Sequence, residues 1–574
     1  MKRLVLFLIV AGVAAAGIWY GVRRTAMAPH VAVAALLPKE TVALLTVPDF
    51  NRMRDQWRQT DIYKIYLEPA MQDFLRKPLS KAPQTDKGSE TLHDIEQLEL
   101  KDGFIALASI ENNNYALVAG FRFRGSQADA EKIIGKWRAQ SSSATVKRES
   151  IDYQGHKIDI AGEGANQIAT VYDGDWFFAA NDIERLKALI DRTDHRAPNA
   201  ASNGQSTLEQ DENFRAAMAH MPSGYAALVY VQPKSFADKL AALREQVSKP
   251  LPANQQTMLE QIHSVAGAVR FDGGKIHDWW FVGMPKQEQN EKLTRSAVSL
   301  GTTDTIFYLA TLLNVDRLAK LNETGATPGS VWFKKAFDAA TRMGLTADDW
   351  KAAFDLELGS LADWPTGGRW PNLIVTLPVK DLARAEKVVT AFTAAIDEDL
   401  GWTRTEKDDV RYFSARLGLW NFIATTPTIA LSKDRLIAGL DPAWVEEAVR
   451  RSQQSSSSFA SSAPYKSTVH ALAEPTNFFA YIDMPLLYSR LDAALRPMLL
   501  MTAAFMPAIS DHVDVTKLPP PEVITKHLSP IVSSQRYEGD GYVSESVGPI
   551  TLSQAAVGIG LPAAFWFGIH PGSH

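Results

Sequence analysis

Histidine and carboxylate side chains, which could bind a metal ion or transfer a proton, occur in this sequence only in short scattered groups. The densest group is DHVD, Asp511 to Asp514, where an imidazole stands between two carboxylates. Imidazole and carboxylate are common metal ligands and common acid–base groups. The group comes just before a proline-rich stretch, however, and this position favours a solvated loop over a site.

Two carboxylate clusters raise the possibility of glycoside hydrolysis, which requires two acids facing each other across a cleft. One is DEDL, with acids at positions 397–399, and the other is the pair Asp408 and Asp409. Adjacent acids near a helix end are more often a solvated face. The sequence also contains no H-E-x-x-H, G-x-S-x-G, P-loop or EF-hand pattern. We therefore predict no catalytic, cofactor-binding or metal-binding residues, and we favour a non-enzymatic protein while leaving an enzyme as the alternative.

The chain contains no cysteine, which excludes disulfides, cysteine nucleophiles and thiolate metal sites. It contains 14 tryptophans, and five of these fall close together in the second half. Aromatic rings can provide stacking surfaces for sugars or peptides, but they also dominate cores and interfaces. If the protein has a ligand-binding face, the candidates are Trp350, Trp364, Trp370, Trp402 and Trp420.

The N-terminus predicts attachment to a membrane. Leu4 to Val22 is an uncharged run of 19 residues bracketed by Lys2-Arg3 and Arg23-Arg24. About 20 apolar residues are needed to cross the hydrocarbon as a helix. A cleaved signal peptide is the alternative, because AMA at Ala26 to Ala28 resembles a cleavage site. A buried core helix is a third reading. We favour an anchor, with the N-terminus inside and the body outside the cytoplasm.

Two further apolar stretches lie near the C-terminus. Residues 550–569 carry no charge and could form a second membrane segment, or could dock on the protein's own core. Leu495 to Ile509, LRPMLLMTAAFMPAI, is rich in methionine. A core helix is the common explanation of such a segment, and an exposed, adaptable contact surface for a partner or for lipid is the alternative. The net charge of −5 predicts no nucleic-acid partner.

The two halves of the chain resemble each other. DAEKIIGKW, Asp129 to Trp137, matches RAEKVVTAF, Arg384 to Phe392. Five pairs of segments match in the same order, with offsets of about 252 to 266 residues. The sequence therefore predicts an internal duplication, although two unrelated α+β regions could share such a pattern. The matching positions are apolar or structural, which favours binding or scaffolding over catalysis.

Alternating strands and amphipathic helices predict the fold class. We expect an α+β protein with tandem duplicated antiparallel sheets, helices packed on one face of each, and an N-terminal transmembrane helix. The expected divisions are 1–28 for the anchor or signal, 29–295 and 296–548 for the two halves, and 549–574 for the apolar tail.

The stretch LLPKETVALLTVPDFNRMRDQW, from Leu36, follows the N-terminal apolar run and precedes the repeated units. With the ending HLSPIVSSQRYEGDGYVSESVGPITLSQAAVGIG, it resembles an uncharacterised bacterial family of membrane-anchored envelope proteins that share a domain of unknown function. The resemblance implies a bacterial source and an envelope location. It implies no activity and no functional residues.

These observations leave three hypotheses. The first is a membrane-anchored, extracytoplasmic binding or structural protein that contacts an envelope protein or polymer and sits in the inner membrane. The second is a hydrolase with a site of scattered Asp, His and Ser between the halves. The third is a lipid-handling protein with an apolar tunnel.

Overall fold

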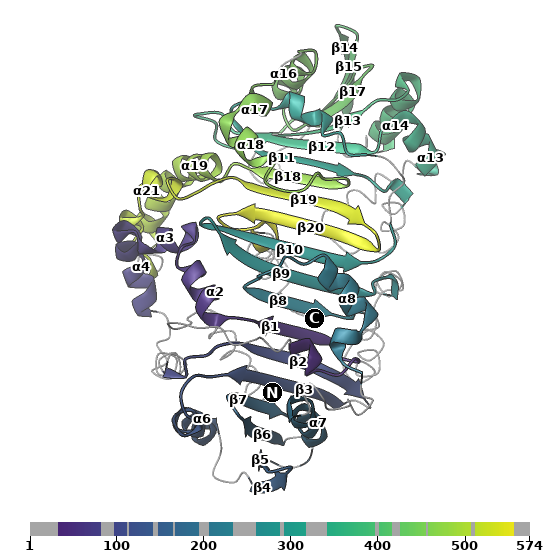
Figure 1. Ribbon diagram of the computed structural model, residues 1–574. Coiled ribbons are helices and arrows are strands. Elements are labelled where there is room, and N and C mark those ends of the chain that lie inside the picture. The colour runs from purple at the N-terminus through teal and green to yellow at the C-terminus, as the bar shows by residue number, and fades with distance from the viewer. Residues whose placement is uncertain are drawn as a thin grey trace, which may run out of the picture. The chain divides into compact units, whose positions relative to one another are not determined.

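The computed structural model describes residues 33–81, 94, 97–111, 114–141, 147–162, 164, 167–194, 206–233, 260–286, 292–316, 341–395, 401–415, 425–454, 457–506 and 511–555. These residues form two compact units (Figure 1). The first unit comprises residues up to Leu67, Leu75–Pro285 and Glu538–Val543. The second comprises Glu68–Phe74, Lys286–Tyr537 and the residues from Ser544 onward.

The first unit is built on an antiparallel sheet. Its strands pair in the order β4-β5-β6-β7-β3-β2-β1-β8-β9-β10. Their bounds are β1 Ala43–Val47, β2 Gly103–Glu111, β3 Asn114–Arg122, β4 Arg148–Tyr153, β5 His156–Ala161, β6 Ile168–Asp173, β7 Trp176–Ala180, β8 Ala227–Val231, β9 Ser264–Asp272 and β10 Lys275–Gly283.

Helices cover both faces of this sheet. One core contains residues of α7 (Ile183–Asp194), α8 (Glu212–Ala219) and the short turns η1 (Val33–Ala35) and η3 (Leu208–Gln210). The other core contains residues of α2 (Phe50–Trp57) and α6 (Gln127–Ser141). Two further helices of this region are α3 (Asp61–Leu67) and α4 (Pro69–Lys81). The first residues of α4, up to Phe74, belong to the second unit.

The expectation of helices on one face was therefore wrong. Successive strand residues point to opposite faces, so a sheet with one wet face requires alternating polar residues. On β7, Phe178 lies in the core beneath α7, whereas its neighbour Phe177 lies in the core beneath α6. Both faces of the central strands are apolar, and each needs its own layer of helices.

The strands of the second unit pair in the corresponding order, β14-β15-β16-β17-β13-β12-β11-β18-β19-β20. The first residues of β20, up to Val543, are assigned to the first unit. The bounds are β11 Thr305–Leu312, β12 Glu357–Asp363, β13 Asn372–Pro378, β14 Trp402–Lys407, β15 Val410–Ala415, β16 Thr428–Leu431, β17 Arg435–Gly439, β18 Phe478–Ile482, β19 Ile531–Glu538 and β20 Gly541–Gly548.

Its helices also form two layers. One core includes residues of α16 (Pro442–Ser452), α17 (Ser458–Ser461), α18 (Ala463–Thr468) and η4 (Ser296–Leu300). The other includes residues of α13 (Ala347–Ala353) and α14 (Leu382–Ala395). A long helix, α19 (Met484–Phe505), follows β18, and the short η6 (Val515–Lys517) and α21 (Pro521–Thr525) come after it.

The two sheets share their register as well as their strand order. In each sheet a row of directly paired residues crosses six neighbouring strands, from β7 to β9 in the first unit and from β17 to β19 in the second. In the first unit the row is Ala180, Val118, Ala106, Leu44, Tyr230 and Ala266. In the second it is Gly439, Ile374, Leu361, Tyr308, Tyr481 and Val532. A register slip of one residue would turn every side chain to the other face, so this agreement is specific.

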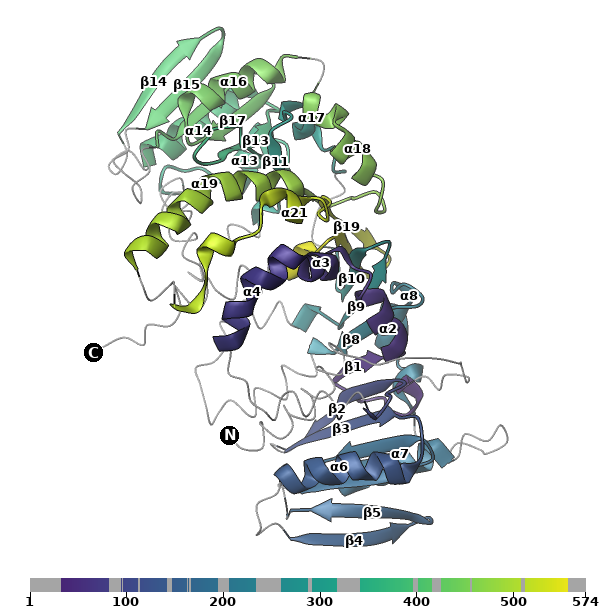
Figure 2. The same ribbon diagram turned by 90° about the vertical axis from the view of Figure 1, so that its left-hand side faces the viewer.

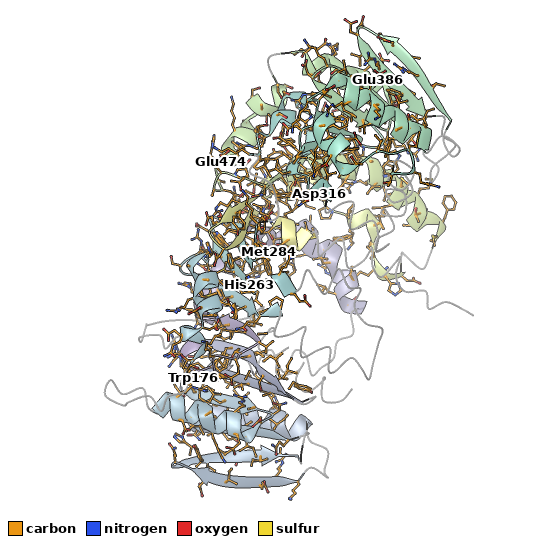
Figure 3. The ribbon with its side chains drawn as sticks, turned by 90° about the vertical axis from the view of Figure 1, so that its right-hand side faces the viewer. Trp176, His263, Met284, Asp316, Glu386 and Glu474 are labelled. Atoms are coloured by element: carbon orange, nitrogen blue, oxygen red, sulfur yellow. The ribbon has the colours of Figure 1, made fainter. Side chains whose placement is uncertain are left out.

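The Ala-Glu-Lys segments take the same place in both units, each on the helix that follows the third strand. Ala130 on α6 and Ala385 on α14 are buried, as are the two branched residues after each Ala-Glu-Lys. The glutamates differ in their contacts. Glu131 accepts a hydrogen bond of 2.7 Å from the Tyr172 hydroxyl. Glu386, labelled in Figure 3, binds Arg404 and Arg411. The repeated segment is thus a packing element.

The predicted N-terminal anchor at residues 4–22 lies outside the described residues, as does most of the apolar tail. Among the helices that the structure does describe, none combines the length and the hydropathy of a membrane-spanning segment.

Candidate functional site

The five candidate tryptophans occupy different environments. Trp350 and Trp402 pack on the core beneath α13 and α14. Trp364 is 3% exposed, and its indole Nε1 donates a hydrogen bond of 2.8 Å to the Gly368 carbonyl. Trp370 is 40% exposed, and Trp420 lies outside the described residues. Trp350 and Trp402 thus share one core, and among the four of these tryptophans that the structure describes only Trp370 is exposed.

The acidic pair Asp408 and Asp409 forms the turn between β14 and β15. Both residues have positive φ, 52° and 58°, and Lys407 pairs with Val410 across the turn. Two residues of positive φ are the requirement of a type I′ hairpin, and Asp tolerates that conformation. Gln154 and Gly155, at φ 50° and 86°, make the corresponding turn between β4 and β5. The pair therefore has a structural role.

The remaining polar candidates are the acids at 397–399 and the DHVD group. The acids at 397–399 lie outside the described residues. In DHVD, Asp511 and His512 are exposed, and the Asp514 carboxylate accepts hydrogen bonds from Thr516 at the start of η6. Within the described ranges no group of three His, Asp or Glu residues is placed to hold a metal ion.

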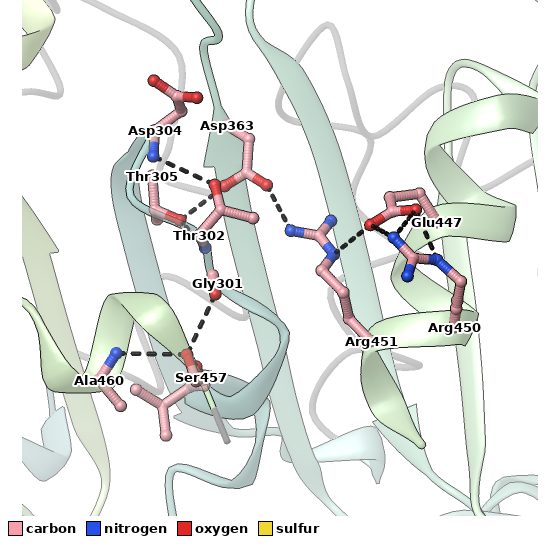
Figure 4. A network of polar contacts seen from close by, with 11 residues as sticks. Gly301, Thr302, Asp304, Thr305, Asp363, Glu447, Arg450, Arg451, Ser457 and Ala460 are labelled. Atoms are coloured by element: carbon pink, nitrogen blue, oxygen red, sulfur yellow. Dashed lines mark hydrogen bonds and ion pairs between the residues drawn. The ribbon is translucent and has the colours of Figure 1, made fainter. Parts of the chain in front are cut away.

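A polar pocket of about 400 Å³ lies beside α16 and α17 in the second unit (Figure 4). Arg451 at its wall is buried, and its Nη1 donates a hydrogen bond of 2.8 Å to the Asp363 carboxylate, which is also buried. Asp363 accepts a second hydrogen bond, of 2.6 Å, from the Thr305 hydroxyl. No motif links Asp363 with Arg451, so sequence reasoning did not anticipate this pair.

The hydroxyl groups around this pocket hold the local backbone. The Ser457 hydroxyl donates to the carbonyls of Val298 and Gly301, each at 3.0 Å, and accepts from the Ala460 amide at the start of α17. A catalytic serine needs a neighbouring base to accept its proton. The hydrogen-bond acceptors of Ser457 are backbone carbonyls, which cannot serve as such a base. The polar residues that line the pocket therefore connect the segments around η4, α16 and α17 by hydrogen bonds.

Helix α19 presents a different surface. Its first half is fixed to the second unit. Leu486, Leu487 and Ala494 pack against the cluster of Ile306, Ala362 and Trp364. The Arg490 side chain donates hydrogen bonds to the Trp364 carbonyl and to the Asp304 carboxylate, at 2.8 and 2.9 Å.

Arg496 marks the end of the fixed half. Its guanidinium binds the Asp492 carboxylate one turn earlier, at 2.6 Å, and donates to the carbonyls of Leu518 and Pro519. The hydrogen bond with the Asp492 carboxylate raises the pKa of Arg496 above its ordinary value. Pro497 follows, and it removes one backbone hydrogen bond from the interior of the helix.

The second half of α19 and the residue after it are apolar and exposed. Figure 2 shows the path of the helix, which extends past α21. We call residues 497–506 the α19 tip. Its large side chains have exposed fractions of 41–80%: Met498, Leu499, Leu500, Met501, Phe505 and Met506. Scattered exposed leucines are ordinary in proteins, whereas a contiguous apolar patch marks an interaction site. The α19 tip is therefore the candidate functional site.

Sequence reasoning found this segment through its methionines but favoured a core helix. In fact no residue of α19 is buried. Hydropathy alone could not distinguish a core helix from an exposed one, because both are apolar. The distinguishing fact is that the polar anchors Arg490 and Arg496 both lie before the tip.

Comparisons with known proteins add a family match. A search of curated proteins gave no match. Among solved structures, crystal form I of TP0453 is 8% identical, with a TM-score of 0.23, covering 46% of this chain and 82% of that one. Crystal form IV is 6% identical, with a TM-score of 0.22, covering 44% and 79%. Similarity at this level supports no statement about function. A family model described as "Protein of unknown function (DUF3352)" matches residues 83–326, from before β2 to beyond β11, so this part of the chain is similar to an uncharacterised domain.

Proposed function

We propose that this protein is a membrane-anchored binding or structural protein of the bacterial envelope. Its N-terminal segment at residues 4–22 holds it in the inner membrane, and its two α+β units lie outside the cytoplasm. An envelope protein or polymer, or the membrane itself, is the partner.

The observation that carries this proposal is the exposed apolar surface of the α19 tip. Five successive residues, 497–501, are exposed, and residues 497–510 contain no charged side chain. Exposing such a surface to water is unfavourable by about 25 cal/mol for each Å² of apolar area. A surface of this kind favours contact with an apolar partner.

The contacts of the polar pocket also favour binding or scaffolding over hydrolysis. Asp363 and Arg451 neutralise each other, and Ser457 donates to backbone carbonyls. These groups stabilise the fold around η4 and α17 without presenting a paired nucleophile and base.

We infer that the two units descend from one duplicated unit. They share strand order and register, and each places an Ala-Glu-Lys helix after its third strand. Both glutamates bind residues of their own sheets. What the copies retain is therefore packing, as expected of a scaffold.

Membrane topology tests the proposal. One epitope is placed in the segment 199–205 and another after His574, and intact spheroplasts are treated with protease before carbonate extraction of the membranes. We expect loss of the first epitope from a protein that stays in the membrane. A control chain without residues 4–22 should be released by carbonate. A protected first epitope would place the body in the cytoplasm and contradict the proposal, and release of the full chain would contradict the anchor.

A further inference from the structure

The α19 tip has no polar face. With 100° between successive helical residues, Met498, Leu499, Leu500 and Met501 point in four directions around the helix axis, and all four are at least 41% exposed. Phe505, seven residues after Met498 and therefore on the same side of the helix, is 80% exposed. Met506, which follows the helix, is 52% exposed. The apolar surface therefore surrounds the helix.

A helix that is apolar on all sides fits fewer environments than a helix with one apolar face. A helix that docks in a protein groove needs only one apolar face, with residues spaced at i, i+3, i+4 and i+7. A helix that lies flat on a membrane likewise keeps a polar face toward water. A helix that is apolar all round belongs in a medium that is apolar on every side, such as a protein core or hydrocarbon.

Two polar groups of the α19 tip are paired within it. The Thr502 hydroxyl donates a hydrogen bond of 2.8 Å to the Met498 carbonyl, and the Met506 amide donates to the Thr502 carbonyl at 2.9 Å. Pro497 has no amide proton to satisfy. Hydrocarbon favours backbone whose polar groups are paired within the segment, and these two contacts are of that kind.

The length of the α19 tip also fits a single leaflet. At about 1.5 Å of rise per residue, the helical residues 497–505 extend roughly 13 Å. The hydrocarbon of a bilayer is about 30 Å thick, so one leaflet is about 15 Å. The charged Arg496 stands directly before the tip, paired with Asp492, and Asp511 is the next charged residue after it.

We propose that the α19 tip inserts end-on into the hydrocarbon of one leaflet of a lipid bilayer. Arg496 and the carbonyls of Leu518 and Pro519 fix the base of the tip to the second unit at the level of the lipid headgroups. This inference rests on the proposed function in one respect, because the N-terminal anchor would keep the tip close to the membrane at high effective concentration.

The absence of natural cysteines permits a direct test on the full chain. Leu499→Cys places a thiol in the tip, and Leu440→Cys provides a matched control, because the two leucines are 45% and 46% exposed. Each thiol is labelled with the fluorophore NBD, whose emission rises in hydrocarbon. The chains are reconstituted into vesicles of phosphatidylethanolamine and phosphatidylglycerol, with or without nitroxide on the acyl chains.

We expect the label at position 499 to brighten and to lose most of its emission to the acyl-chain nitroxides, while the label at 440 does neither. A second variant, Leu499→Asp with Met501→Asp and a label at Phe505→Cys, should lose this quenching yet still float with the vesicles, because its N-terminal segment is intact. Unchanged circular dichroism would show that the variant remains folded.

The outcomes separate the two proposals. Flotation without quenching at position 499 would overturn insertion of the tip and leave the anchor intact. Failure of the full chain to float would contradict the proposed membrane anchoring itself. Brightening of the 499 label without vesicles, rising with protein concentration, would identify a second copy of the chain as the occupant and would also overturn insertion.

Discussion

The buried charges of this protein act as structural elements. The Arg122 guanidinium forms two hydrogen bonds of 2.7 Å with the buried Asp102 carboxylate in the first unit. In the second unit the Glu357 carboxylate accepts hydrogen bonds from the backbone amides of Thr294, Arg295 and Ser296. A buried charge is tolerated only when it is paired or well hydrogen-bonded. The energetics of these residues can therefore be tested by removing one partner.

The buried pair beside the polar pocket gives the first prediction. Asp363→Asn leaves the buried Arg451 without its counter-charge, and breaking such a pair costs about 3–5 kcal/mol. On the same helix, Arg450 pairs with Glu447 at the surface. Arg450→Gln should therefore cost about 0–1 kcal/mol. Urea unfolding, followed by circular dichroism, measures both values. Equal losses in the two variants would show that burial of the Asp363–Arg451 pair is unimportant.

Buried tyrosines give a prediction for alkaline pH. Burial raises the pKa of Tyr308 and of Tyr481 above the ordinary value of 10, and the nearby Asp483 raises that of Tyr481 further. Below about pH 10 both states hold the phenolic proton, and this part of the stability is constant. Above it the unfolded chain loses the proton while the folded chain keeps it, so stability falls as pH rises. Each tyrosine contributes up to about 1.4 kcal/mol per pH unit.

Tyr481→Phe should reduce this alkaline loss, and Tyr115→Phe, at an exposed position, should leave it unchanged. Thermal unfolding between pH 8 and 11 would record the effect. An identical dependence of stability on pH for Tyr481→Phe and the unmodified chain would show that Tyr481 does not contribute to the alkaline loss.

At the scale of elements, the two units cap equivalent helices in the same way. The Asp182 carboxylate accepts from the amides of Glu184 and Arg185 at the start of α7. The Asp441 carboxylate accepts from Ala443 and Trp444 at the start of α16. Replacing either aspartate by alanine should cost about 1 kcal/mol, and replacement by asparagine a few tenths at most, because asparagine also caps. Urea midpoints of the four variants test this. If alanine lowers the urea midpoint at only one of the two positions, the two caps do not contribute equally to stability.

These local elements were the part of the fold that the sequence could predict. The apolar stripe at Ala130, Ile133 and Ile134 is typical of an amphipathic helix, here α6. Asp441 followed by Pro442 is typical of a helix start, here that of α16. Each of these two signals depends only on residues within one or two helical turns of each other. The pairing of β3 with β7 could not be predicted in this way, because it joins segments separated by three strands and a helix.

For the candidate site, the sequence predicts the apolar composition but not the exposure. The apolar composition of residues 495–509 was evident, but exposure depends on what packs against a segment, and that is decided by distant residues. Arg496 fixes the base of the tip by binding Leu518 and Pro519, which lie beyond it in the chain. The second layer of helices was missed because it also depends on distant contacts: Phe177 and Phe178 are neighbours in the sequence but lie in different cores.

At the scale of the whole molecule, each unit contains a short segment from the other half of the chain. Glu538–Val543 belongs to the first unit, where Glu538 and Asp540 each lie 3.3 Å from the His220 ring. Glu68–Phe74 belongs to the second unit, where Glu68 binds His527 at 2.6 Å and Lys526 at 2.9 Å. Neither half of the sequence therefore contains a complete unit.

This exchange predicts how a divided chain behaves. If the chain is cut between residues 288 and 289 and both pieces are produced in one cell, each piece supplies a segment that the other requires. We expect the tagged first piece to retain the second through detergent extraction and affinity purification. Alone, the first piece lacks Gly541, whose backbone lies against the fully buried Phe281, so it exposes apolar surface and should be degraded. Glu538→Ala with Asp540→Ala should weaken retention, whereas Asp348→Ala, at a site 91% exposed, should not. If each piece alone unfolds cooperatively at the midpoint of the intact chain, the exchanged segments are dispensable and the units are independent.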